Sequence, residues 1–183
     1  MIDSNTANII EAMRAQEETI RCCNYFQRNA CNDIDESCRK SMVVWCQQVQ
    51  KALKLNPETV WIAMSFFDRY LSSGKGKSQE ALEDRYKFQL AAIAAFYTAI
   101  KICTHVKFDA ATLAKLCQHY FAAADITSME KDILFALDWR VSCPTPMEFV
   151  RYLLELLPEK INSSISESIL EASQKYVDHT ATD

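Results

Sequence analysis

One short segment of this chain could perform chemistry, because it resembles a phosphate-binding loop. Gly76, Lys77 and Ser78 reproduce the last three positions of a P-loop, whose backbone N–H groups and lysine bind nucleotide phosphates. That motif needs another glycine five residues before this ending, and Leu71 occupies that position. It also follows a strand, whereas the residues before Gly76 have helical periodicity. We therefore expect a solvated loop and no nucleotide site.

Eight cysteines and three histidines are the next candidates, for a metal site or for catalysis. The cysteines show no Cys-x-x-Cys spacing, and the adjacent Cys22 and Cys23 lack a second pair of ligands at zinc spacing. Most cysteines fall within helical periodicity, where a reduced thiol behaves as a small apolar side chain. His105, His119 and His179 are scattered along the chain. We expect no metal, no cofactor and no enzymatic site.

Composition and charge narrow the class of protein. Apolar residues make up 49% of the chain and charged residues 24%, which is typical of soluble globular proteins. No apolar run reaches the roughly 18 residues of a membrane span, and the N-terminus lacks the regions of a signal peptide. The net charge of −4 disfavours nucleic-acid binding, which usually requires a basic face. We expect a soluble intracellular protein that binds neither membrane nor nucleic acid.

The elements that position the functional side chains are expected to be helices, so the fold class is all-α. Apolar residues recur at helical spacing almost throughout, and no segment with strand periodicity competes. Asn56 and Pro57 predict one helix start, Asp109 caps another, and a capping box from Thr127 to Glu130 predicts a third. The expected helices span residues 7–26, 33–53, 57–73, 84–105, 109–120, 127–139, 147–157 and 166–179.

The helix expected at 84–105 is apolar on nearly every side. Residues 90–100 carry no charge. Such a helix is either buried all round or spans a membrane, and this one is too short to span. We expect a central helix with the others packed around it.

Motifs along the chain resemble the cyclin box in their order and spacing. They are Arg39-Lys40 with Trp45, Asp68-Arg69-Tyr70-Leu71, Lys87-Phe88-Gln89-Leu90-Ala91 with Lys101, Met129-Glu130 with Trp139, and Pro144-Thr145-Pro146 with Phe149. The resemblance implies a five-helix bundle around a central helix at 33–143. It also implies an N-terminal lead-in helix within 1–32 that packs on the box, and an exit helix followed by the first helix of a truncated second repeat at 144–183. Features near both ends resemble the D-type, or G1, cyclins: Ile10, Met13 and Gln16-Glu17-Glu18, and Tyr176-Val177.

The resemblance implies a regulatory function in the cell cycle. A cyclin binds a cyclin-dependent kinase and positions its αC helix, so that the αC glutamate meets the ATP-binding lysine; the phosphoryl transfer takes place on the kinase. The chain itself is then not an enzyme, and its expected location is the nucleus and cytoplasm.

Five positions carry the residue that the cyclin family has at that place. Arg39 and Asp68 are implied to form a structural ion pair between the first two box helices, with Leu90 near their junction. Lys101 and Glu130 are implied to bind the kinase backbone. We expect both of these to be exposed to solvent when no partner is bound.

The resemblance also implies a substrate-docking groove that binds Arg-x-Leu motifs. The groove positions are Met42, Trp45, Gln48 and Gln89, with Cys38 and Ser41 beside them. Trp45 and Gln89 match the family pattern. Ser41 replaces a large aliphatic residue, and Gln48 replaces the acid that pairs with a basic motif.

One departure from the family pattern keeps an alternative open. Family members commonly carry acids shortly after the lysine, where this chain has Cys103 and Thr104. The alternative is an atypical cyclin-fold protein that acts as an interaction module or transcription regulator without activating a kinase. The chain has no Leu-x-Cys-x-Glu motif for recruiting pocket proteins.

Overall fold

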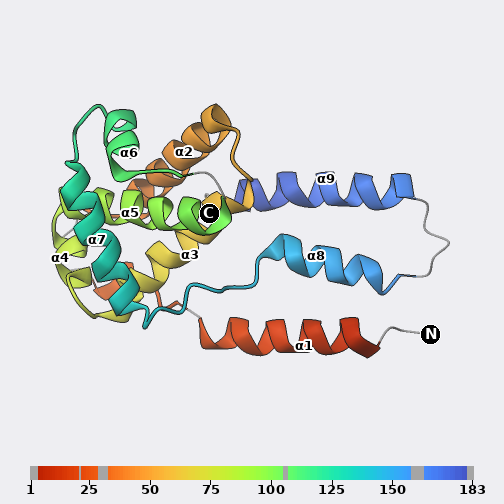
Figure 1. Cartoon of the computed structure of the whole chain (residues 1–183). Coiled ribbons are helices and arrows are strands. Elements are labelled where there is room, and N and C mark those ends of the chain that lie inside the picture. Colours follow the sequence, from red (N-terminus) through yellow and green to blue (C-terminus); the bar gives the residue numbers. More distant parts are fainter. Residues whose placement is uncertain (1–3, 21, 29–32, 105–106, 158–162, 181–183) are drawn as a thin grey trace. The chain divides into compact units, whose positions relative to one another are not determined.

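A computed structural model describes residues 4–20, 22–28, 33–104, 107–157 and 163–180 (Figure 1). All regular elements within these residues are helices, as expected for an all-α chain. The α-helices are α1 (Ser4–Thr19), α2 (Glu36–Leu53), α3 (Glu58–Ser73), α4 (Ser78–Glu83), α5 (Arg85–Cys103), α6 (Ala110–Leu116), α7 (Ala123–Ala136), α8 (Pro146–Glu155) and α9 (Ser163–Thr180). A short 3-10 helix, η1, spans Tyr25–Arg28.

The chain divides into two compact units. One consists of residues 22–141, and the other joins residues 1–21 with 142–181. In the first unit α5 packs against α2, α3, α4 and α7, and residues 90–100 are all buried. The prediction of a central apolar helix is therefore confirmed.

Side-chain caps determine where three of these helices begin. The Asp35 carboxylate accepts a hydrogen bond from the Cys38 backbone N–H at 3.0 Å at the start of α2. Asp84 accepts from the N–H groups of Tyr86 and Lys87 and so caps α5, and Asp109 caps α6. Such caps satisfy N–H groups that have no partner within the helix, and each contributes about 1 kcal/mol.

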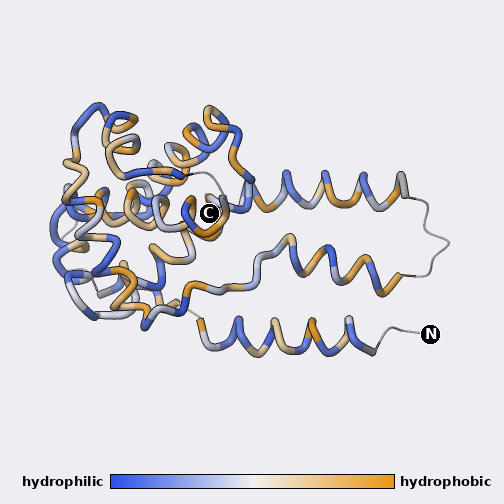
Figure 2. The backbone as a smooth tube through the Cα atoms, viewed as in Figure 1, coloured by the Kyte–Doolittle hydropathy of each residue, from blue (hydrophilic) through white to orange (hydrophobic). Residues whose placement is uncertain are grey.

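The second unit contains α1, α8 and α9, with α8 in contact with both other helices. Figure 2 shows hydrophilic and hydrophobic bands alternating along these helices, as expected where one face packs and the other is solvated. Thr145 and Glu148 form a capping box at the start of α8, with Pro146 in the first turn. The Gln16 amide donates to the Ser142 carbonyl at 3.0 Å, which ties the end of α1 to the segment before α8.

Several predicted helix boundaries are wrong because tertiary contacts and backbone turns override the local pattern. The first helix ends at Thr19 and not at residue 26, and Tyr25 instead donates to Asp68 at 2.7 Å. α6 ends at Leu116, because Gln118 and His119 adopt left-handed φ angles of 52° and 58°. The predicted capping box at Thr127 is also wrong. α7 already begins at Ala123, and the Thr127 hydroxyl donates to the Ala123 carbonyl within the helix.

The loop between α3 and α4, which contains Gly74 and Gly76, is attached to α7 by the side chain of Asp132. The Asp132 carboxylate accepts hydrogen bonds from the Lys77 backbone N–H at 2.9 Å and from the Tyr70 hydroxyl at 2.5 Å. Lys75 forms a second link, an ion pair with Asp138 at 2.9 Å. Both lysine side chains are exposed, but the loop backbone is held in place, and a short helix that was not predicted, α4, begins directly after it.

Candidate functional site

The two predicted kinase-binding residues lie side by side and pair with each other. Lys101 stands in the last turn of α5, and Glu130 stands on α7. The Lys101 ammonium lies 2.9 Å and 3.1 Å from the two Glu130 carboxylate oxygens. It also lies 5.0 Å from the centre of the Tyr97 ring, within the range of a cation–π interaction.

The exposure of this pair is strongly unequal. The Lys101 side chain is 47% exposed, whereas that of Glu130 is 7% exposed. The prediction that Glu130 is solvent-exposed is therefore wrong. Glu130 lies on the face of α7 that carries Met129 and Ile133, both buried, and this places its carboxylate close to α5.

Burial makes the carboxylate dependent on its neighbours. The Thr98 hydroxyl donates to the Ala94 carbonyl at 2.9 Å and also lies 3.4 Å from Glu130 Oε1, so the Lys101 ammonium is the closer partner of both carboxylate oxygens. A charge at this depth is stable only when it is paired and hydrogen-bonded. The pair therefore acts as one unit that presents the lysine ammonium to solvent, with Ile102 exposed beside it on α5.

Arg39 and Asp68 form a two-bond ion pair between α2 and α3. Arg39 Nε donates to Asp68 Oδ1 at 3.0 Å, and its Nη2 donates to Oδ2 at 2.8 Å. Both side chains are 19% exposed. The Tyr25 hydroxyl also donates to Asp68, and burial together with that carboxylate raises the pKa of Tyr25. Three elements, η1, α2 and α3, therefore meet at one carboxylate.

Tyr25 was not predicted to be part of this cluster. It follows the first helix in sequence, and nothing in its local pattern points to a partner 43 residues away. Arg69 also has a distant partner that was not predicted: its Nη2 donates to the Arg140 carbonyl at 2.7 Å and so ties α3 to the segment after α7. Leu90 is buried, as expected of its place in the apolar helix.

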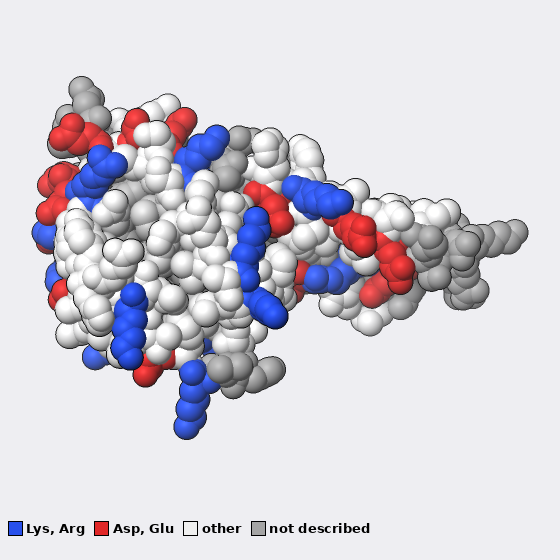
Figure 3. All heavy atoms as spheres, turned by 90° about the horizontal axis from the view of Figure 1, so that it is seen from above, with Lys and Arg blue, Asp and Glu red and all other residues white. Residues whose placement is uncertain are grey.

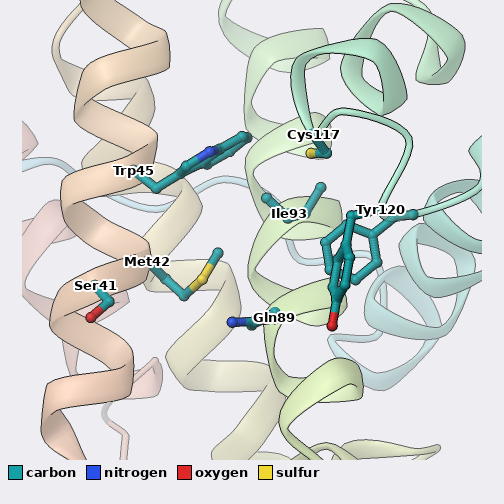
Figure 4. Close-up of a pocket in the computed structure, with 8 residues that line it drawn as sticks. Ser41, Met42, Trp45, Gln89, Ile93, Cys117 and Tyr120 are labelled. Carbon is teal, nitrogen blue, oxygen red and sulfur yellow. The ribbon is translucent and has the colours of Figure 1, made fainter.

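A groove of about 320 Å³ lies between α2, α5 and the segment after α6 (Figure 4). Three of the four predicted docking residues line it: Met42, Trp45 and Gln89. Gln48 is exposed on α2 and is not among the lining residues. The remaining lining side chains are Ser41, Ile93, Cys117, Tyr120 and Phe121.

The segment after α6 supplies a wall that the sequence did not predict. Tyr120 is 60% exposed and forms an aromatic cluster with Phe121 and Tyr86, at centroid distances of 4.8 Å and 5.5 Å. Cys117 directly follows α6, and burial raises the pKa of its thiol to about 11, so that the group is neutral at physiological pH. The wall arises from the left-handed residues Gln118 and His119, which turn the chain back toward the groove.

Other kinds of site find no support in the described part of the chain. It contains no group of three His, Cys, Asp or Glu side chains placed to hold a metal ion. None of its helices combines the length and hydropathy that crossing a membrane requires. On the face displayed in Figure 3, acidic and basic side chains are interspersed between large uncharged areas.

Comparison with known proteins finds a family model and several relatives whose descriptions agree with one another. Residues 8–142 match the family model described as the N-terminal domain of cyclin. The chain is 25% identical over 183 residues to the mouse G1/S-specific cyclin-D1, covering 99% of this chain and 59% of that protein. It is 31% identical over 122 residues to the G2/mitotic-specific cyclin-1 of Antirrhinum majus, covering 66% of this chain and 24% of that protein.

The same comparisons extend to a carrot protein and to a solved structure. The G2/mitotic-specific cyclin C13-1 of Daucus carota is 26% identical over 156 residues, covering 84% of this chain and 43% of that protein. The chain thus spans less than two thirds of each of these relatives. The X-ray structure of a viral cyclin from herpesvirus saimiri shares the fold, with a TM-score of 0.73 at 18% identity, over 96% of this chain and 72% of that one.

Proposed function

Since this chain belongs to the cyclin family, as the match over residues 8–142 shows, we propose that it binds and activates a cyclin-dependent kinase. Cyclins as a family are regulatory subunits and not enzymes. In the proposed mechanism the chain holds the kinase αC helix inward, so that the αC glutamate meets the ATP-binding lysine. Binding selects the active kinase conformation, and the kinase carries out the phosphoryl transfer.

The observation that carries this proposal is the Lys101–Glu130 pair at the junction of α5 and α7. The exposed ammonium has three donors, so it can bind kinase backbone carbonyls while it stays paired with Glu130. Ile102, 48% exposed, offers an apolar contact next to this charge. An apolar side chain that becomes buried beside a charge-assisted bond excludes water from that bond, which is the environment in which interface hot spots lie.

The test compares two substitutions of exposed aliphatic residues. Ile102→Asp places a charge beside Lys101, and Leu153→Asp places one on α8 at a similar exposure of 51%. Neither change removes a buried group, so both variants should keep their melting temperatures. We expect Ile102→Asp to weaken the binding of a purified cyclin-dependent kinase by about tenfold or more, while Leu153→Asp leaves it unchanged. Equal binding by both variants would place the kinase interface elsewhere.

A cyclin-fold interaction module that does not activate a kinase is the second candidate function. The segment after Lys101 favours it, since the Thr104 hydroxyl donates to the Ile100 carbonyl at 2.9 Å and no carboxylate stands at Cys103 or Thr104. Measuring kinase activity together with binding separates the two functions. Binding with no rise in phosphorylation of a histone substrate would favour the interaction module.

We further propose a role in G1 phase, with the protein in the nucleus and cytoplasm. The alignment with the mouse cyclin-D1 over 99% of this chain supports the G1 assignment, although the mitotic relatives match over shorter stretches at similar identity. Imaging a fluorescently tagged chain in synchronised cells, with its level followed through the cycle, tests both proposals.

A further inference from the structure

A row of apolar side chains on α9 faces solvent. Ile165, Ile169, Ala172 and Tyr176 are all exposed, and Tyr176, at 70%, is the most exposed large apolar side chain of the described residues. Their spacing of four, three and four residues is that of the a and d positions of a coiled coil, so the four side chains lie along one side of the helix. We call these four residues the α9 stripe.

A different side of α9 packs within its own unit, against α8 (Figure 1). The half-buried residues Ser166, Leu170, Ser173 and Val177 each follow one residue after a member of the stripe. Because one residue turns an α-helix by about 100°, the α9 stripe points away from the side that packs on α8. The stripe is therefore apolar surface that remains exposed after the unit has packed, and contiguous apolar surface of this kind marks an interaction site.

The size of the α9 stripe suits a small protein–protein interface. Its four side chains expose roughly 350 Å² of apolar surface. Apolar atoms make up about 57% of a typical interface, so a contact centred on the stripe buries roughly 600 Å² on each partner and about 1,200 Å² in total. This total lies at the lower limit of specific interfaces, where affinities are modest.

The order of side-chain sizes along the stripe fits a second copy of α9 in the antiparallel direction. A two-fold axis midway between Ile169 and Ala172 places these two residues opposite each other in both directions, and it places Ile165 opposite Tyr176. Two helices that cross are closest at the crossing point, where the small alanines lie. They separate toward both ends, where the larger pair fills the wider space. A parallel pair instead places Ala172 opposite Ala172 and leaves a void between the helices.

The charges beside the stripe are compatible with this arrangement. The stripe itself contains no charged side chain. Lys175, which is exposed at the edge of the stripe, lies beside Ser168 of the other copy in the antiparallel pair. No like charges are therefore brought together along this edge, and the two helix dipoles are also opposed, which is favourable.

We propose that the chain forms a homodimer in solution through the α9 stripe, with the two α9 helices antiparallel. A second copy is the partner because the large and small members of the stripe complement one another about a two-fold axis. The inference is independent of kinase binding, which is proposed for the Lys101–Glu130 pair in the other unit.

Sedimentation equilibrium of the full chain between about 1 µM and about 300 µM measures the association. Ile165→Asp changes the stripe, and Leu153→Asp is the matched control on α8, since the two side chains are 52% and 51% exposed. An aspartate in the first turn of α9 suits the helix N-terminus, so Ile165→Asp should not destabilise the helix. We expect wild type and Leu153→Asp to dimerise with a dissociation constant on the order of 10 µM. Ile165→Asp should dimerise at least about tenfold more weakly, because each copy then buries a carboxylate against Tyr176.

Cysteine substitutions test the antiparallel register. Ile169→Cys and Ala172→Cys proteins with different tags are mixed and treated with a mild oxidant, and the disulfides are located by mass spectrometry of tryptic peptides. We expect the disulfide between position 169 of one protein and position 172 of the other to form at least about fivefold faster than those between identical positions, because only that pair lies directly opposite. Wild type treated in the same way controls for the native cysteines.

The inference fails if wild type stays monomeric up to about 300 µM, which would mean that the stripe binds a different protein or none. It also fails if Ile165→Asp dimerises as tightly as Leu153→Asp while both have the helical far-UV spectrum of wild type. Faster disulfide formation between identical positions would overturn the antiparallel arrangement. A monomeric chain that binds the kinase overturns only this inference, and a dimeric chain that binds no kinase overturns only the proposed function.

Discussion

The Asp68 carboxylate receives hydrogen bonds from two residues on different elements, Arg39 and Tyr25. Removing Arg39 leaves a mostly buried carboxylate without its cation, so Arg39→Ala should lower the free energy of unfolding by about 3 kcal/mol. Arg39→Ala with Asp68→Ala should cost less than the sum of the single changes by about 1 kcal/mol or more, measured by urea denaturation. Strict additivity would show that the two residues do not act as partners.

Because Lys101 is partly exposed and Glu130 is buried, we expect substitutions of the two residues to lower the free energy of unfolding by different amounts. Lys101→Ala leaves a carboxylate that is 7% exposed without its cation, and should lower the free energy of unfolding by about 1–3 kcal/mol. Glu130→Gln keeps an oxygen that can accept from Lys101, and should cost less than about 1 kcal/mol. Thermal denaturation of the two variants checks the order. A larger loss in Glu130→Gln would mean that the buried charge itself, and not its pairing, stabilises this junction.

At the scale of elements, the loop between α3 and α4 binds the carboxylate of Asp132, which lies on α7. Gly76 has a φ of 57°, and a Cβ there would lie 2.6 Å from an Asp132 oxygen. Gly74 has a similar φ of 63° but open space around it. Gly74→Ala should therefore cost about 1–2 kcal/mol for the left-handed backbone alone. Gly76→Ala should cost distinctly more, because it also displaces Asp132 from Tyr70 and Lys77. Equal losses in urea denaturation would show that Asp132 moves away freely.

The sequence predicts elements well where their cause is local. α5 follows from an uncharged run, and the starts of α2, α5 and α6 follow from aspartate caps at or near the expected positions. The end of α6 could not be predicted, because it depends on left-handed residues at Gln118 and His119, where no glycine signals a turn. The start of α7 could not be predicted either, because Ala122 precedes the helix and supplies no side-chain cap.

The candidate sites are predicted in part, for the same physical reason. Arg39 and Asp68 were matched through family resemblance, since two residues 29 positions apart carry no local sign of pairing. The burial of Glu130 was missed because an acidic residue in a capping-box pattern normally lies at an exposed helix start. Tyr120 was missed as a groove residue because its position depends on the turn after α6.

At the scale of the whole molecule, the division into two units predicts how the chain can be cut. The Lys101–Glu130 pair, the Arg39–Asp68 pair and the groove all lie within residues 22–141, and α5 finds its partners α2, α3, α4 and α7 there. We expect a fragment of residues 22–141 to fold on its own, with a helical far-UV circular dichroism spectrum and a cooperative thermal transition, because the buried α5 packs against four helices of the same unit. A fragment of residues 22–121 is the matched control. It lacks α7 and exposes the face of α5 that α7 covers, and it removes the buried Ile126 and Ile133, so it should not melt cooperatively. The packing of the N-terminal helix on the box, predicted from the resemblance, concerns the two units together and stays a prediction. If residues 22–141 fail to fold while the full chain is stable, the first unit depends on residues 1–21 or 142–183 for its stability.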